Sequence, residues 1–177
     1  MLSSVLQNPK RPLVVVIGGA KIETKLPLIE KMHQFADFVL AGGKIAEETK
    51  TLLKVQHEKV PNRKSVLLIA EVNSDHTDIT ELSCENFVQI IQKEAKTVVW
   101  NGTMGKIEDQ THQKTTEEIA RAIVQSGAYS IVGGGDTVGF LDKKGLLNGF
   151  NFVSTGGGAM LAFLAGEKLP GIEALLP

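Results

Sequence analysis

Short apolar runs recur along the chain, and most of them end at a glycine. They are rich in Val, Ile and Leu and occupy residues 13–17, 38–41, 65–70, 97–100, 130–133 and 152–154. Near-continuous apolar runs of this length, bounded by turn residues, are typical of strands that are buried on both faces. The pattern therefore predicts about six strands of a parallel sheet.

The segments between these runs have the spacing of amphipathic helices. In residues 83–96 and 115–127 the apolar positions recur so that they fall on one face of a helix. Ser83 is a candidate N-cap for the first helix, and Thr115 or Thr116 for the second. Strands that alternate with helices predict an α/β fold. We expect a doubly wound, Rossmann-like parallel β-sheet with helices on both faces.

Charge and composition narrow the classes of function. The 19 Lys and Arg residues nearly balance the 20 Asp and Glu residues, which leaves no basic surface for a nucleic acid or an anionic membrane. The single cysteine, Cys84, excludes an internal disulfide and suits a reducing compartment. Residues 1–12 lack the apolar segment of a signal peptide, and no run approaches the roughly 20 residues of a membrane span. We expect a soluble, cytoplasmic, single domain over residues 1–177.

Glycine-rich segments follow five of the predicted strands. They are residues 18–25, 41–44, 100–105, 133–137 and 154–159. In a doubly wound sheet, ligands bind beyond the carboxyl ends of the strands. Glycine there lets the backbone approach a ligand, and the helix N-terminus that follows favours an anion. One such segment is explained by a turn alone, but five at the same edge favour an anion site. The familiar P-loop and GxGxxG dinucleotide fingerprints do not occur.

Charged side chains in these segments suggest phosphate chemistry. Lys21 and Lys25 lie four residues apart, which in a helical turn places both ammonium groups on one side. The alternative for this pair is two solvated lysines. Asp136 follows three glycines at a predicted helix start, where it is either an N-cap or a carboxylate for Mg²⁺. Two lysines, an acid suited to Mg²⁺ and several glycine turns are the components that phosphoryl transfer requires.

Four motifs carry a resemblance to a known family. "GGAKIETK" at 18–25, "VVWNGTMG" at 98–105 followed by Glu108, "VGGGDT" at 132–137 and the stretch beginning "VSTGGGAM" at 153 occur in this order. The chain, over about residues 8–176, closely resembles the nucleotide-binding C-terminal half of phosphoglycerate kinase. The resemblance implies reversible transfer of the γ-phosphoryl group of ATP to the carboxylate of 3-phosphoglycerate in glycolysis.

The resemblance implies a catalytic role for two segments. Lys21 would contact the transferring phosphoryl group, and the glycines that open the last helix would cradle it. The catalytic set is thus Lys21, Gly156, Gly157 and Gly158. Asp136 would be the metal residue and would carry Mg²⁺ through oxygens of the nucleotide phosphates.

Other positions would bind ATP or ADP. Lys25 would hold the nucleotide phosphates, and Asn101 and Thr137 would lie beside them. Glu108 would accept hydrogen bonds from the ribose hydroxyls. Glycines complete the set, with Gly18, Gly19, Gly42 and Gly43 around the adenine and Gly134 and Gly135 in the turn before Asp136.

The chain departs from the family pattern at positions that bear on this site. Thr103 stands where the family usually has Pro, and "DITELS" at 78–83 replaces a Gly-Pro turn. The polar stretch 47–64 takes the place of several tens of residues. We therefore expect a more open adenine pocket than the family pattern would give.

The substrate half of the family pattern is absent. The family binds 3-phosphoglycerate on an Arg- and His-rich face of a separate N-terminal domain, and a hinge brings the two halves together. Here the arginines are scattered at Arg11, Arg63 and Arg121. His33, His57, His76 and His112 show no ligand spacing and are interpreted as surface residues, and residues 74–78 as a polar loop.

We therefore expect a monomeric nucleotide-binding domain that meets 3-phosphoglycerate only when an N-terminal domain is present and that is inactive alone. The alternative is a non-catalytic nucleotide-binding module derived from the same family. Lys21, Lys25 and Asp136 favour the kinase, because nucleotide affinity alone would not need a group that meets the migrating phosphoryl.

Overall fold

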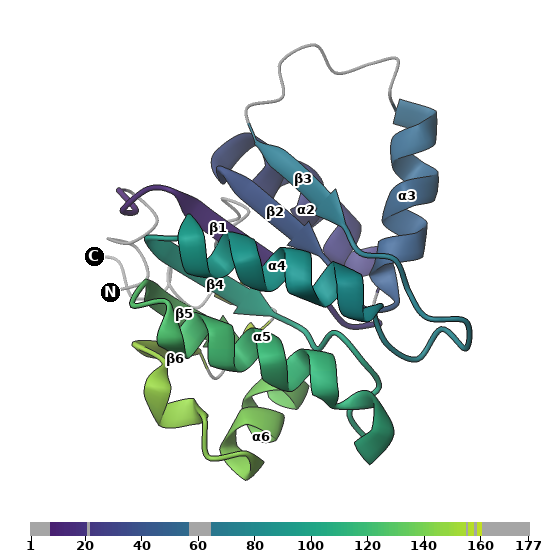
Figure 1. The fold of residues 1–177 in the computed structure, drawn as a ribbon. Helices are drawn as coiled ribbons and strands as arrows, with labels where there is room; N and C mark the ends of the chain where they lie inside the picture. Colours follow the sequence, from purple (N-terminus) through teal and green to yellow (C-terminus); the bar gives the residue numbers. More distant parts are fainter. Residues whose placement is uncertain (1–7, 21, 57–64, 155, 158, 161–177) are drawn as a thin grey trace.

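Six strands and five α-helices alternate in the part of the chain that the structure describes (Figure 1). The computed structural model describes residues 8–20, 22–56, 65–154, 156, 157, 159 and 160, and for 22–27, 30 and 52–56 it describes only the backbone. The strands are β1 (Leu13–Ile17), β2 (Phe38–Ala41), β3 (Val66–Ile69), β4 (Thr97–Asn101), β5 (Tyr129–Gly133) and β6 (Phe152–Ser154). Each lies within one residue of its predicted range.

The helices follow the strands as the sequence pattern predicts. They are α2 (Ile22–Phe35), α3 (Ile45–Gln56), α4 (Glu81–Lys93), α5 (Lys114–Gln125) and α6 (Gly135–Lys143), with short 3-10 helices η1 (Gln110–His112) and η2 (Leu147–Gly149). None of the helices in the described part of the chain has the length and apolar character needed to cross a bilayer.

All six strands are parallel, in the order β3-β2-β1-β4-β5-β6. The chain first winds outward from β1 to β3 and then crosses back to β4, so that the winding direction reverses between β1 and β4. The predicted doubly wound fold is therefore confirmed. In such a sheet the crevice for a ligand lies at this reversal, beyond the carboxyl ends of the two central strands.

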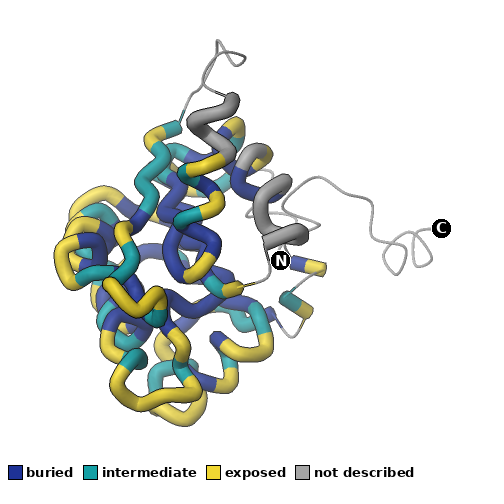
Figure 2. The backbone as a smooth tube through the Cα atoms, turned by 90° about the vertical axis from the view of Figure 1, so that its right-hand side faces the viewer, coloured by how far each residue is buried: buried dark blue, intermediate teal, exposed yellow. Residues whose placement is uncertain are grey.

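The sheet is buried on both faces, because successive residues of a strand point to opposite sides. Val14 and Val16 of β1 belong to one apolar cluster, with residues of α4, α5 and α6, whereas Val15 and Ile17 belong to a second cluster with residues of α2 and α3. Figure 1 shows α4 and α5 in front of the sheet and α2 behind it. In Figure 2 the central part of the tube is almost entirely buried. The expected core position of Trp100 is confirmed, since its side chain is fully buried.

The predicted helix caps were wrong, because tertiary contacts use the hydroxyl groups concerned. The N-cap of α4 is Thr80, whose hydroxyl accepts the N–H of Ser83 at 3.3 Å. Ser83 instead accepts the N–H of Glu71 at 2.9 Å. Helix α5 begins at Lys114, and both Thr115 and Thr116 lie inside it with buried hydroxyls that bond to other segments.

Candidate functional site

The carboxyl ends of the strands form one continuous row across the sheet. Ile17 of β1 pairs with Ala41 of β2 on one side and with Asn101 of β4 on the other. Asn101 in turn pairs with Gly133 of β5, which pairs with Ser154 of β6. The glycine-rich segments leave the sheet from this row. The sequence prediction that they gather at one edge is therefore confirmed.

The segments after β1, β2 and β4 are bonded directly to one another. The N–H of Gly18 donates to the carbonyl of Asn101 at 2.8 Å, and that of Gly19 donates to the carbonyl of Thr103 at 2.7 Å. The N–H of Gly42 donates to the carbonyl of Ile17 at 2.8 Å. The residues predicted to surround an adenine are thus held together by backbone hydrogen bonds across the reversal point of the sheet.

Met104 lies beneath these glycines. Its side chain is 1% exposed and fills the space beside Gly18 and Gly42 in which a Cβ atom would otherwise lie. Thr103, which replaces the family's usual proline, is also buried. A base that binds at these glycines would therefore contact their opposite side and would not contact the Met104 side chain.

The turn after β4 is held by side chains of the two helices beneath it. The hydroxyl of Thr116 in α5 accepts the N–H groups of Met104 at 3.0 Å and Gly105 at 3.3 Å. The hydroxyl of Thr137 in α6 accepts the N–H of Gly102 at 3.0 Å. Thr137, a predicted phosphate neighbour, is 1% exposed and contacts the turn from below.

The side chain of Asn101 lies where the segments after β4, β5 and β6 meet. It is 4% exposed, and its Nδ2 is a buried donor with no hydrogen-bond partner among the described residues. A Cβ atom placed on Gly134 would lie 3.1 Å from this nitrogen, and one placed on Gly157 would lie 3.2 Å from it. An unpaired buried donor costs about 1–3 kcal/mol. Because buried polar groups are nearly always paired, this nitrogen is a candidate donor to an acceptor that a ligand would supply.

Glycine is required at two positions around this amide. Gly134 has a φ of 102°, which other residues adopt only with strain. A Cβ atom on Gly157 would lie 2.5 Å from the Cα atom of Gly134, so the backbones of the two segments are nearly in contact. Gly156 precedes this contact and is exposed, and Gly158 lies outside the described residues.

Helix α6 begins beside Asn101. Its N-cap is Gly134, so the alternative in which Asp136 caps the helix is wrong. Asp136 lies in the first turn together with Gly135, and both are exposed. Within the described part of the chain, the Asp136 carboxylate makes no hydrogen bond or ion pair. The first N–H groups of a helix lack intrahelical acceptors and favour a negative charge nearby. The end of α6 thus combines anion-favouring N–H groups with a carboxylate that a hard cation could use.

The two lysines of the first motif are only partly covered by the structure. Lys21 lies outside the described residues. Lys25 belongs to α2, but the structure describes only its backbone. Their predicted roles therefore remain predictions from the sequence.

Glu108 lies in the segment that connects β4 to α5. Its side chain is exposed and makes no hydrogen bond or ion pair within the described part of the chain. The backbone on either side of it is fixed. The carbonyl of Ile107 accepts the side-chain amide of Gln113 at 2.7 Å, and the N–H of Asp109 donates to the carbonyl of Lys106 at 3.0 Å.

Histidine positions were predicted poorly from the sequence. His33 is 9% exposed and contacts the hydroxyl of Ser65. The side chain of His112 is only 19% exposed, and its Nδ1 lies 3.1 Å from the hydroxyl of Thr77. Only His76 is a surface residue among the described histidines, and it pairs with Glu47 at 2.9 Å. His57 lies outside the described residues.

Asp78 is the most buried carboxylate near these segments, at 7% exposure. Its Oδ1 accepts the hydroxyl of Thr115 and, at 2.8 Å, the N–H of Ile79. Burial raises the pKa of Asp78 above its ordinary value, although these hydrogen bonds act in the opposite direction.

We expect the substitution Asp78→Asn to change how stability depends on pH. Because the folded protein holds the Asp78 proton more tightly than the unfolded chain does, ionised Asp78 costs stability at neutral pH. This cost disappears as the pH falls through the raised pKa. The stability of the variant relative to the wild type should therefore be greater at pH 7 than at about pH 4.5. Urea unfolding at several pH values measures this difference, and a difference that does not change with pH would contradict the expectation.

Comparison with known proteins identifies the family. Residues 1–68 and 51–167 match the family described as phosphoglycerate kinase. The chain belongs to the phosphoglycerate kinase family.

Individual members of the family match almost the whole chain. Phosphoglycerate kinase from Baumannia cicadellinicola subsp. Homalodisca coagulata is 34% identical over 209 residues, and that from Haemophilus ducreyi is 34% identical over 212. These alignments cover 99% and 98% of this chain but 54% of each relative. The chain thus spans about half the length of the curated relatives it matches, in their C-terminal part.

Solved phosphoglycerate kinase structures have the same fold as this chain. The enzyme from Coxiella burnetii superposes with a TM-score of 0.83 at 30% identity, and that from Pyrococcus horikoshii with 0.77 at 28%. Each covers 98% of this chain, and the chain covers 55% and 54% of them. The alignments with the two curated relatives run over more positions than the 177 residues of the chain, and the two family matches overlap at 51–68. This agrees with the short polar stretch at 47–64.

Proposed function

We propose that this chain is the nucleotide-binding half of a phosphoglycerate kinase. It would bind MgADP or MgATP at the carboxyl edge of the sheet for reversible phosphoryl transfer with 3-phosphoglycerate. The acceptor would be held by an N-terminal domain that is not part of these 177 residues. Membership of the family and the arrangement of the glycine-rich segments support this proposal.

The unpaired amide of Asn101 is the observation that carries the proposal. It is buried between the segments after β5 and β6, beside the N-terminus of α6. A phosphate oxygen would supply the missing acceptor, and a charged acceptor makes a stronger hydrogen bond than a neutral one. A neutral ligand would satisfy the amide but would gain nothing from the helix N-terminus.

The residues present also suit Mg²⁺ as a companion of the nucleotide. Mg²⁺ takes few protein oxygens, retains several waters and binds phosphate oxygens directly. Asp136 offers one exposed carboxylate in the first turn of α6. When bound, the ion neutralises phosphate charge. Lys21 would meet the transferring phosphoryl group, while Gly156, Gly157 and Gly158 would cradle it and Lys25 and Asn101 would hold the nucleotide phosphates.

Calorimetry with millimolar MgADP tests the proposal directly. We expect binding by the 177-residue chain, since the proposed adenine, ribose and phosphate contacts all lie within it. Glu108→Ala should weaken the affinity for ADP by roughly 10- to 150-fold, the range for one lost charged hydrogen bond. The same substitution should leave the affinity for 2′,3′-dideoxyADP nearly unchanged. Absence of any heat or thermal shift with wild type would contradict nucleotide binding, and equal losses for both ligands would contradict the ribose role.

A further inference from the structure

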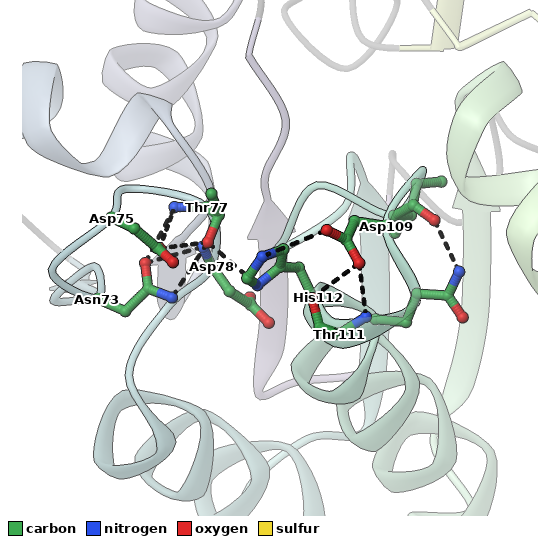
Figure 3. Close-up of polar contacts among 9 residues, drawn as sticks. Asn73, Asp75, Thr77, Asp78, Asp109, Thr111 and His112 are labelled. Carbon is green, nitrogen blue, oxygen red and sulfur yellow. Dashed lines mark hydrogen bonds and ion pairs between the residues drawn. The ribbon is translucent and has the colours of Figure 1, made fainter.

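Two connections at the carboxyl edge of the sheet are bonded side by side (Figure 3). The first, residues 71–79, joins β3 to α4 and is closed by an antiparallel bridge between Val72 and Ile79. The second, residues 106–113, joins β4 to α5 and contains Glu108. The N–H of Lys106 donates to the carbonyl of Thr77 at 2.8 Å and so joins the two.

The first connection is closed by hydrogen bonds between its own residues. The side-chain carbonyl of Asn73 accepts the N–H groups of Thr77 at 2.9 Å and Asp78 at 3.1 Å. The N–H of Asn73 donates to the carbonyl of Asp78 at 2.9 Å. The hydroxyl of Thr77 donates to the carboxylate of Asp75. These bonds leave the oxygen of Thr77 in a fixed place beside the second connection.

His112 joins the two connections through its side chain. Because the only hydroxyl proton of Thr77 is directed to Asp75, Nδ1 of His112 must donate the hydrogen bond of 3.1 Å to Thr77. The backbone of His112 is joined to the turn that carries Glu108, because its N–H donates to the carbonyl of Asp109 at 3.0 Å. The other ring nitrogen lies 3.8 Å from a carboxylate oxygen of Asp109, which is too far for a hydrogen bond. Asp109 also accepts the N–H of Thr111 at 3.0 Å. The imidazole thus lies between the fixed Thr77 and the backbone turn that carries Glu108.

We propose that His112 is a positioning residue for Glu108, tying the turn that carries this carboxylate to Thr77 and Asp75 before a nucleotide binds. The inference rests on the proposed ribose role of Glu108. A side chain whose backbone is already fixed loses less conformational entropy on binding a ligand than one whose backbone must be ordered at the same time. Residues 74–78, which the sequence pattern indicates to be a polar loop, would then be the anchor of this arrangement.

The test compares affinities for MgADP and Mg-2′,3′-dideoxyADP in the 177-residue chain. The ratio of the two affinities isolates the contribution of the ribose hydroxyls. His112→Leu, which removes both ring nitrogens, should lower this ratio by at least about threefold, the lower range of coupling within one hydrogen-bonded network. The same substitution should have little further effect in the Glu108→Ala background. His112→Asn keeps a donor near the position of Nδ1 and should restore part of the ratio.

Matched variants separate positioning from folding. His76→Asn changes an exposed histidine of the same connection, at a φ of 58° that Asn tolerates, and should leave the ratio unchanged. If His112→Leu does not fold, Thr77→Val removes the same hydrogen bond from the other side and carries the test.

The outcomes distinguish this inference from the proposed function. A wild-type chain that does not bind MgADP would overturn both. A wild-type chain that binds both nucleotides equally well would overturn the ribose role of Glu108, and with it this inference, but not nucleotide binding. Discrimination that is lost in Glu108→Ala but kept in His112→Leu and Thr77→Val would overturn the positioning role alone. Equal weakening of both nucleotides by His112→Leu would show that His112 only supports the fold, and would also overturn it.

Discussion

Replacing Asn101 with Leu is expected to make the protein more stable while weakening its binding of MgADP. Leu has a similar branched shape and removes a buried donor that has no partner in the described part of the chain. Removing the unpaired group should raise the free energy of unfolding by about 1–3 kcal/mol. The lost hydrogen bond to a charged phosphate should weaken the affinity for MgADP by roughly 10- to 150-fold. Urea unfolding and calorimetry measure the two effects.

Asn151→Leu is the matched control for this substitution. The side-chain carbonyl of Asn151 accepts the N–H of Ser130 at 2.8 Å, at the opposite end of the sheet. Replacing Asn151 with Leu removes the partner of a buried N–H and should lower stability, without changing the affinity for MgADP. If Asn101→Leu lowered stability in the same way, or left MgADP affinity intact, the amide would be part of the framework and not of a ligand site.

This opposition between stability and binding is expected at a functional site. Nearly all buried polar groups in folded proteins have a hydrogen-bond partner. A buried group without a partner in the described chain therefore indicates that ligand binding, and not stability, determines the residue at that position. The sequence alone could place Asn101 at a strand end but could not show that its amide is unpaired. That property depends on Gly134 and Gly157, which lie on two other segments.

The strands and the doubly wound fold class could be predicted because they depend on local patterns. A strand covered on both faces must be apolar along its whole length, and parallel strands joined by helices place all their carboxyl ends at one edge. For this reason the gathering of the glycine-rich segments was predicted correctly. The helix caps failed because the hydroxyls of Ser83, Thr115 and Thr116 bond to distant segments, and such bonds leave no mark on the local sequence.

The hydrogen bond of His112 to Thr77, on which its proposed positioning role rests, could not be predicted for the same reason. Histidine spacing in the sequence can reveal a metal site, but it says nothing about a single imidazole between two connections. The contact joins His112 to Thr77, far apart in the chain. It forms because the connections after β3 and β4 leave the sheet at the same edge, although β2 and β1 lie between these two strands. A polar cluster in each of two connections at that edge was the only available signal.

Catalysis is expected to require more than this chain. Transfer between an acyl phosphate and ADP needs donor and acceptor in line and nearly in contact, and such positioning can contribute roughly 7–11 kcal/mol to lowering the barrier. The chain spans 54% of its curated relatives and offers residues suited to the nucleotide. We expect no measurable 3-phosphoglycerate-dependent ATP turnover from the 177 residues alone. A coupled assay of ADP release at high protein concentration measures it.

Turnover should appear when the chain is fused to the N-terminal half of a related phosphoglycerate kinase. In the fusion, Lys21→Ala should lower the turnover rate far more than it lowers the affinity for ADP. The charge of Lys21 would act chiefly on the phosphoryl group during transfer. Lys143→Ala, an exposed lysine in the last turn of α6, is the control and should retain the rate. A fusion that binds both substrates but remains inactive would favour the non-catalytic module. Robust turnover by the unfused chain would instead require an acceptor site within these 177 residues, and would overturn the division of the two substrates between two halves.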